Sequence, residues 1–85
     1  MKEFKYTITD PEGIHARPAG ELAKKAATYT CNVRIARGEK EVDAKRIMGI
    51  MTLGVKQGME IIIRTEGEGE DEAIVELQQF VEASF

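Results

Sequence analysis

The alternation of apolar and polar residues predicts four short strands, because side chains along a strand point in turn to its two faces. Each strand would bury one face and expose the other. The middle two flank a turn that contains Gly38 and are typical of an antiparallel hairpin. The strands are expected over residues 4–8, 31–35, 41–44 and 59–65.

A different spacing predicts three helices. Ala19, Leu22 and Ala26 recur at the interval of one helical face. We expect this helix to begin at Pro18, since a proline in the first turn removes no internal hydrogen bond, and to end near Ala27. A short helix is expected within 45–53, where Gly49 and Gly54 limit its length, and a third closes the chain after the acidic turn at 66–70. Its inward stripe is expected to be Ala73, Leu77, Phe80, Val81 and Ser84.

This order, βαββαβα, indicates an α/β (α+β) open-faced two-layer sandwich. A four-stranded antiparallel sheet would be covered on one face by three helices, which need a sheet face for their apolar stripes. At 85 residues the chain is too short to divide its core, so residues 1–85 are expected to form a single domain.

The composition of the chain limits where the protein can be located and what kind of partner it can bind. No stretch approaches the ~20 apolar residues of a membrane-spanning helix, and the start lacks a signal peptide, so a cytoplasmic protein without membrane contact is expected. Cys31 is the only cysteine and is expected to be buried, and we expect no metal. All twelve Lys and Arg residues precede residue 65, which favours an acidic protein partner; too few aromatics and no arginine run argue against nucleic acid.

The candidate chemistry lies around His15, the only histidine of the chain. It precedes the first helix, whose unpaired amides, such as that of Ala16, and positive dipole end favour an anion. Arg17 adds a cation, and Gly13 permits a turn that presents the imidazole. These features favour a neutral, nucleophilic imidazole that can hold a phosphoryl group. The alternative is an ordinary histidine that packs or caps near a helix start.

A second feature is an excess of apolar residues between positions 47 and 55. Six of these nine residues are apolar, more than one face of a two-turn helix can bury. They either fill a core, with methionine as an adaptable filler, or form an exposed docking patch. The residues are Ile47, Met48, Ile50, Met51, Leu53 and Val55.

Two motifs carry a family resemblance that covers essentially the whole chain. The segment Gly13-Ile14-His15-Ala16-Arg17-Pro18-Ala19, and residues 45–54 except at one position, resemble the signatures of HPr, the histidine-containing phosphocarrier family of the bacterial phosphoenolpyruvate-dependent sugar phosphotransferase system. The resemblance implies that the δ nitrogen of His15 accepts a phosphoryl group from phosphorylated enzyme I and passes it to the A domains of sugar permeases. Arg17 and the Ala16 amide would stabilise that group.

The resemblance also implies how the protein works with its partners. It would be a carrier without cofactor and not an enzyme, and we expect a monomer. The docking surface would include Gly20, Lys24, Ile47, Met48, Met51 and Gln57.

The departure from the second signature is Arg46, which stands where the family commonly has a regulatory serine. Phosphorylation of that serine would therefore be absent. This leaves open an alternative to the carrier, a regulatory paralogue that binds regulatory proteins and uses His15 phosphorylation as a signal. An independent enzyme is least favoured, because one histidine without a second general base makes a poor active site.

Overall fold

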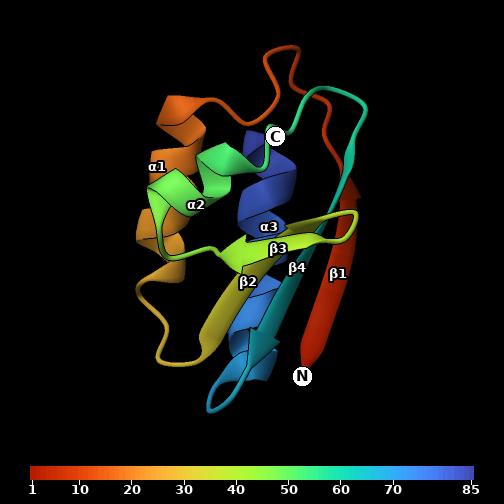
Figure 1. The fold of residues 1–85 in the computed structure, drawn as a ribbon. Helices are drawn as coiled ribbons and strands as arrows, with labels where there is room; N and C mark the ends of the chain where they lie inside the picture. The colour runs from red at the N-terminus through yellow and green to blue at the C-terminus, as the bar shows by residue number, and fades with distance from the viewer.

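The computed structural model describes residues 1–85 and confirms the expected order of elements (Figure 1). Four antiparallel strands form one sheet, and the three helices pack together beside it. None of the helices is long and apolar enough to cross a membrane. The elements are β1 (Lys2–Thr7), α1 (Ala16–Ala26), β2 (Asn32–Arg37), β3 (Lys40–Asp43), α2 (Ile47–Thr52), β4 (Glu60–Glu66) and α3 (Glu70–Ser84).

The sheet has the order β1-β4-β2-β3, so the last strand of the chain lies between the first two. One row of apolar side chains crosses all four strands: Phe4 pairs with Ile63, Ile63 with Ile35, and Ile35 with Val42. Phe4, Ile63 and Ile35 are buried in the core. Burial of each such side chain contributes about 1.5–3 kcal/mol, so this row stabilises the sheet.

Helix α1 begins two residues before the position predicted. Its first residue is Ala16 and its N-cap is His15, while Pro18 occupies the third helical position. Proline is tolerated throughout the first turn, so Pro18 alone could not fix the first residue. Ala19, Leu22, Ala23 and Ala26 are buried, as their spacing predicts.

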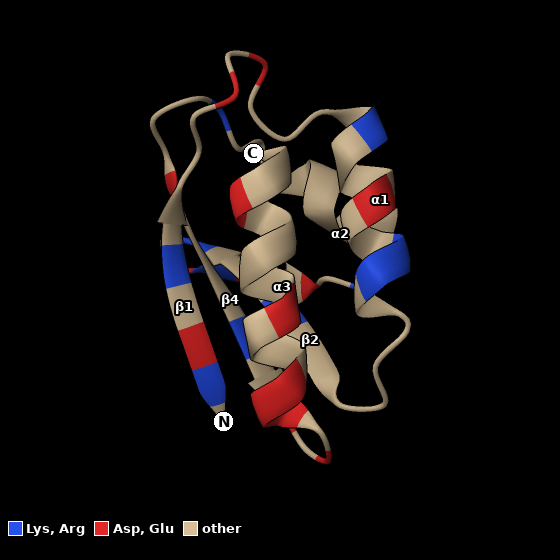
Figure 2. Cartoon of the chain, turned by 180° about the vertical axis from the view of Figure 1, so that it is seen from behind, with Lys and Arg blue, Asp and Glu red and all other residues tan.

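The buried face of α3 contains fewer residues than expected. Ala73, Leu77 and Val81 are buried, whereas Phe80 and Ser84 flank this line and are only partly buried. Acidic residues fill the first turn of α3, and Figure 2 shows them at one end of this helix, while α1 carries mostly Lys and Arg among its charged positions. Basic residues of β1 and α1 form ion pairs with acidic residues of α3, so the charge division of the sequence is not a clean division in space.

Salt bridges hold the open face of the sheet. Arg64 on β4 pairs with Glu3 on β1 and with Glu41 on β3, and Arg34 on β2 also pairs with Glu41. The hydrogen bonds that Arg64 donates to the carboxylates of Glu3 and Glu41 raise its pKa above the ordinary value. All four strands contribute to this charge-balanced network, which occupies the face that the helices leave open.

Tyr29 gives the fold an expected response to alkali. Its hydroxyl donates to Glu76 Oε1 at 2.6 Å, and burial together with this bond raises the pKa of Tyr29 to about 12. Unfolded tyrosine loses its proton near pH ~10. Protonated Tyr29 therefore stabilises the folded protein fully below about pH 10, and this contribution is lost as the pH rises to about 12. Denaturant unfolding between about pH 10 and 12 should show that the free energy of unfolding falls in the native protein and falls less in Tyr29→Phe. Equal falls in the two proteins would contradict the role of Tyr29.

Candidate functional site

A tight turn connects β1 to α1 and sets the position of the candidate site. Gly13 has a φ of 66°, and its N–H donates to the carbonyl of Asp10 at 2.9 Å. A Cβ at this position would lie 2.3 Å from the carbonyl oxygen of Val55. The next residue, Ile14, donates its N–H to that oxygen at 3.1 Å. Glycine is thus required twice, for its conformation and for the close approach of the Val55 carbonyl.

The start of the turn is held from two sides. The carbonyl oxygen of Phe85 accepts hydrogen bonds from the N–H groups of Thr9 and Asp10 and from the Thr9 hydroxyl, at 2.6, 2.9 and 2.9 Å. The Gln57 side chain donates to the Thr9 carbonyl at 3.0 Å. The segment that carries Asp10 is therefore fixed between the end of α3 and the loop before β4.

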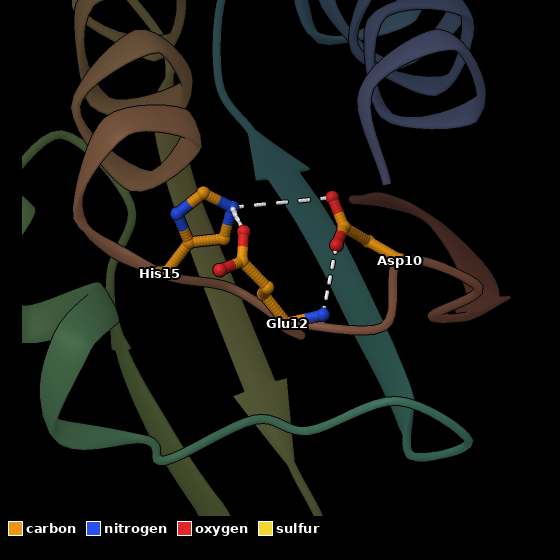
Figure 3. A group of neighbouring side chains, drawn as sticks. All are labelled: Asp10, Glu12 and His15. Carbon is orange, nitrogen blue, oxygen red and sulfur yellow. Dashed lines mark hydrogen bonds and ion pairs between the residues drawn. The ribbon is translucent and has the colours of Figure 1, made fainter.

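His15 projects from the end of this turn. As the N-cap of α1 it has extended backbone angles, and its side chain makes no capping hydrogen bond. The imidazole is 38% exposed, and its Nε2 lies 3.4 Å from Glu12 Oε2 and 4.0 Å from Asp10 Oδ2. Figure 3 shows both carboxylates on the Nε2 side of the ring, with Nδ1 turned away from them. Nδ1 is thus the ring nitrogen left open to a reactant.

The start of α1 offers two backbone donors beside the imidazole. The N–H groups of Ala16 and Arg17 have no partner within the helix, because they belong to its first turn. Pro18 has no N–H, and Ala19 already donates to the carbonyl of His15 at 3.0 Å. The Ala16 amide is therefore placed as the sequence predicts, at a helix end that favours an anion.

The Arg17 side chain, in contrast, does not reach His15. It is 88% exposed, and its Nε lies 3.7 Å from Glu21 Oε1 in the next turn of the helix. Such an exposed ion pair contributes little, about 0.3–0.5 kcal/mol, so it holds the guanidinium only weakly. The charges nearest to the imidazole are the carboxylates of Glu12 and Asp10.

Neither carboxylate is among the site residues predicted from the sequence. Asp10 also stabilises the turn, because its Oδ1 accepts the N–H of Glu12 at 2.9 Å. The spacing of three residues between Glu12 and His15 was the available signal. Asp10, Glu12 and His15 hold donor atoms within 4.8 Å of one another, but a structural zinc site needs a fourth protein ligand, so we assign no metal to them.

The helix pair α1 and α2 carries the predicted docking residues. Gly20 lets the helices approach, since a Cβ there would lie 3.3 Å from Ile47 Cδ1. Of the six apolar residues at 47–55, Ile50, Leu53 and Val55 are buried. The other three, Ile47, Met48 and Met51, are 41%, 71% and 37% exposed, and we call them the apolar patch. Half of this stretch thus belongs to the core, and the other half is exposed at the surface.

The remaining predicted docking residues also lie at the surface. Lys24 and Gln57 are exposed, and Gly20 is partly exposed. A shallow hollow of about 350 Å³ lies nearby and is lined by Glu21, Lys24, Lys25, Thr28 and Phe80. His15 is not part of that lining, so the imidazole faces the surface and not an enclosed substrate cavity.

Arg46 leaves the short helix without a side-chain cap. It is the N-cap of α2 with extended backbone angles, and its side chain forms only an exposed ion pair with Asp43, at 3.9 Å.

Serine at this position can accept a hydrogen bond from the first turn, so Arg46→Ser is expected to raise the free energy of unfolding by about 0.5–1 kcal/mol. Thermal or urea unfolding tests this, with Arg46→Ala as control; no gain over alanine would refute the cap.

The fold and the site define a class of protein: a small open-faced sandwich that presents one exposed histidine at the start of a helix. The family model for the PTS HPr component phosphorylation site matches residues 2–83. The chain belongs to this HPr family of phosphocarrier proteins.

Relatives and solved structures agree with this assignment. The phosphocarrier protein HPr of Mycoplasma capricolum is 42% identical over 79 residues, which cover 93% of this chain and 89% of the relative. The crystal structure of HPr-C-His from Thermoanaerobacter tengcongensis is similar with a TM-score of 0.93 at 40% identity, covering 100% of this chain and 96% of the other.

A third comparison concerns a protein with a different name. The structure of Crh, a catabolite repression protein of Bacillus subtilis, is described as a domain-swapped dimer; it is similar with a TM-score of 0.78 at 34% identity, covering 99% of this chain and 97% of that one. Some structures that are similar to this chain are therefore dimers.

Proposed function

We propose that this protein carries phosphoryl groups on Nδ1 of His15, taking them from phosphorylated enzyme I and giving them to the A domains of sugar permeases. The observation that carries the proposal is the placement of His15: an exposed imidazole whose Nδ1 is open, beside the free amides at the start of α1. We also propose a monomer, which light scattering of the purified protein would test.

The transfer requires few groups from this chain. The lone pair of Nδ1 attacks phosphorus, and the bond to the donor breaks with its electron pair leaving on the donor. The amides of Ala16 and Arg17 can then donate to the phosphoryl oxygens, and the weakly held Arg17 guanidinium can turn from Glu21 to join them. Since an acceptor protein must remove the group to restore His15, the protein acts as a stoichiometric carrier and not as an enzyme.

Partner docking is proposed for the surface formed by the apolar patch with Gly20, Lys24 and Gln57. Methionine side chains adapt to different partners, as a carrier that meets both a donor and several acceptors requires. Helix α1 packs against α2, and its Lys and Arg residues suit an acidic partner surface (Figure 2).

Met48 is the most exposed residue of the apolar patch and the best single test of it. Loss of one buried apolar contact in a complex costs roughly 1.4 kcal/mol, or a tenfold change. Met48→Gln is therefore expected to raise the KM of enzyme I for this protein about tenfold. Val75→Gln is the matched control, because Val75 is also exposed, at 55%, but lies on α3. Equal effects of the two substitutions would exclude the patch as the docking site.

A second candidate function is a regulatory paralogue. Its support is Arg46 in place of the usual serine, together with the likeness to the catabolite repression protein. The discriminating experiment mixes the phosphorylated, purified protein with a permease A domain. Rapid loss of the phosphoryl group to that domain supports the carrier; phosphorylation without transfer to any permease domain supports the regulator.

A further inference from the structure

We propose that Glu12, assisted by Asp10, is a positioning residue for His15: the two carboxylates keep a proton on Nε2 and so determine which nitrogen carries the phosphoryl group and how readily it leaves. The inference rests on the proposed function and adds residues to its site. It starts from the geometry of one turn, in which both carboxylates approach the same edge of the imidazole ring (Figure 3).

The backbone fixes where these carboxylates lie. Asp10 is anchored by the bonds from Thr9 and Asp10 to the Phe85 carbonyl, and its Oδ1 holds the N–H of Glu12. That leaves Asp10 Oδ2 free to face Nε2 at 4.0 Å, while Glu12 Oε2 lies closer, at 3.4 Å. The turn thus places two carboxylates beside Nε2 and none beside Nδ1.

The consequence for neutral imidazole is a choice between tautomers. A neutral ring carries one proton, and an ionised carboxylate can only accept a hydrogen bond. Carboxylates beside Nε2 therefore favour the tautomer with the proton on Nε2, which leaves the lone pair on Nδ1. Carboxylate partners fix histidine tautomers in this way in catalytic triads and metal sites.

The same proton also assists departure of the phosphoryl group. During transfer an acceptor nucleophile attacks phosphorus, the P–Nδ1 bond breaks, and its electron pair returns to Nδ1. If Nε2 keeps its proton, the leaving group is a neutral imidazole; without that proton it would be an imidazolate, a much poorer leaving group. The carboxylates thus favour a phosphohistidine that is ready for transfer.

The ion pairs of His15 involve only Asp10 and Glu12, and the guanidinium of Arg17 lies against Glu21. The carboxylates also repel an incoming phosphoryl group, but they lie on the far edge of the ring from Nδ1 and thus farther from that group than from Nε2. The repulsion is therefore the weaker effect.

The test compares the native protein with Glu12→Gln, Glu12→Ala and Asp10→Asn, in buffer with a chelator. Asparagine at 10 keeps an oxygen for the N–H of Glu12, so the turn remains. Glu68→Gln is the control, because it removes the same charge in the connection between β4 and α3, at the other end of the molecule (Figure 1). The readouts are the ¹⁵N shifts of the imidazole, which report the tautomer, and the pH profile of phosphohistidine hydrolysis.

The Nε2–H tautomer is expected to decrease in the order native, Glu12→Gln, Glu12→Ala, and to stay unchanged in Glu68→Gln. The midpoint of the hydrolysis profile should move toward acid by about 0.5 pH units in Glu12→Gln, the size expected for an exposed charge pair. If Glu12 and Asp10 variants match the control in both readouts, the positioning role is wrong. If even the native protein accepts no phosphoryl group, the proposed function fails, while the tautomer measurement still decides the role of Glu12.

Discussion

His15→Ala is expected to lose phosphoryl acceptance completely while the fold remains. The chain has no second histidine to replace the nucleophile. The imidazole makes no capping hydrogen bond and is 38% exposed, so its removal costs the fold little. A sugar phosphorylation assay reconstituted from enzyme I and a permease should show no flux through the variant, and its melting temperature should remain within a few degrees of the native value.

Ile14→Val controls for small disturbances near His15, because Ile14 is buried next to it and loses only one methylene. That variant should carry phosphoryl groups and be slightly less stable, by about 0.5–1.5 kcal/mol. Flux through His15→Ala above the assay background would place the acceptor on another side chain and overturn the assignment of the site.

Gly13→Ala is expected to cause the largest loss of stability of any alanine substitution in the turn. The Cβ would lie 2.3 Å from the Val55 carbonyl oxygen and 2.7 Å from Lys56 Cα, both backbone atoms that cannot move without the loop. To this overlap is added the cost of a positive φ for a residue with a side chain. Together the two effects should lower the free energy of unfolding by about 3 kcal/mol, which urea unfolding measures.

Gly38→Ala separates the two contributions. Gly38 has nearly the same φ, 61°, but a Cβ there would meet no atom within 4 Å. This control should therefore cost only about 1–2 kcal/mol, the conformational part alone. If Gly13→Ala costs no more than Gly38→Ala, the close approach of Val55 does not hold the turn. Gly13→Ala should also slow phosphoryl acceptance, because the turn that presents His15 has to shift.

The sequence predicted the sheet and its core well because both depend on short-range patterns. Alternation placed Phe4, Ile35 and Ile63 on the buried face, and their pairing follows from the strand order. The predicted start of α1 at Pro18 was two residues late, because proline suits any position of the first helical turn. The placement of Gly13 before the histidine was predictable from its conformational freedom, but the contact with Val55 was not.

The sequence predicted the central residues of the candidate site but not the side chains that surround them. His15 and the Ala16 amide follow from local sequence and helix geometry. The carboxylates on Nε2 depend on how the turn at Asp10 folds back, and its anchor at Phe85 lies 76 residues from Thr9 in the chain. The position of Arg17 in the sequence suggests that its side chain contacts His15. In the structure this long, exposed side chain turns to Glu21 instead, and local sequence does not predict that choice.

The central claim is that His15 is a reversible phosphoryl carrier, and intact mass tests it most directly. The purified protein is incubated with phosphoenolpyruvate and a catalytic amount of enzyme I, and its mass is measured before and after mild acid. The account predicts a gain of one phosphoryl group that acid removes, since a P–N bond is acid-labile, and no gain in His15→Ala. An unchanged mass with an enzyme I proven on another carrier, or a gain that survives acid, would contradict it.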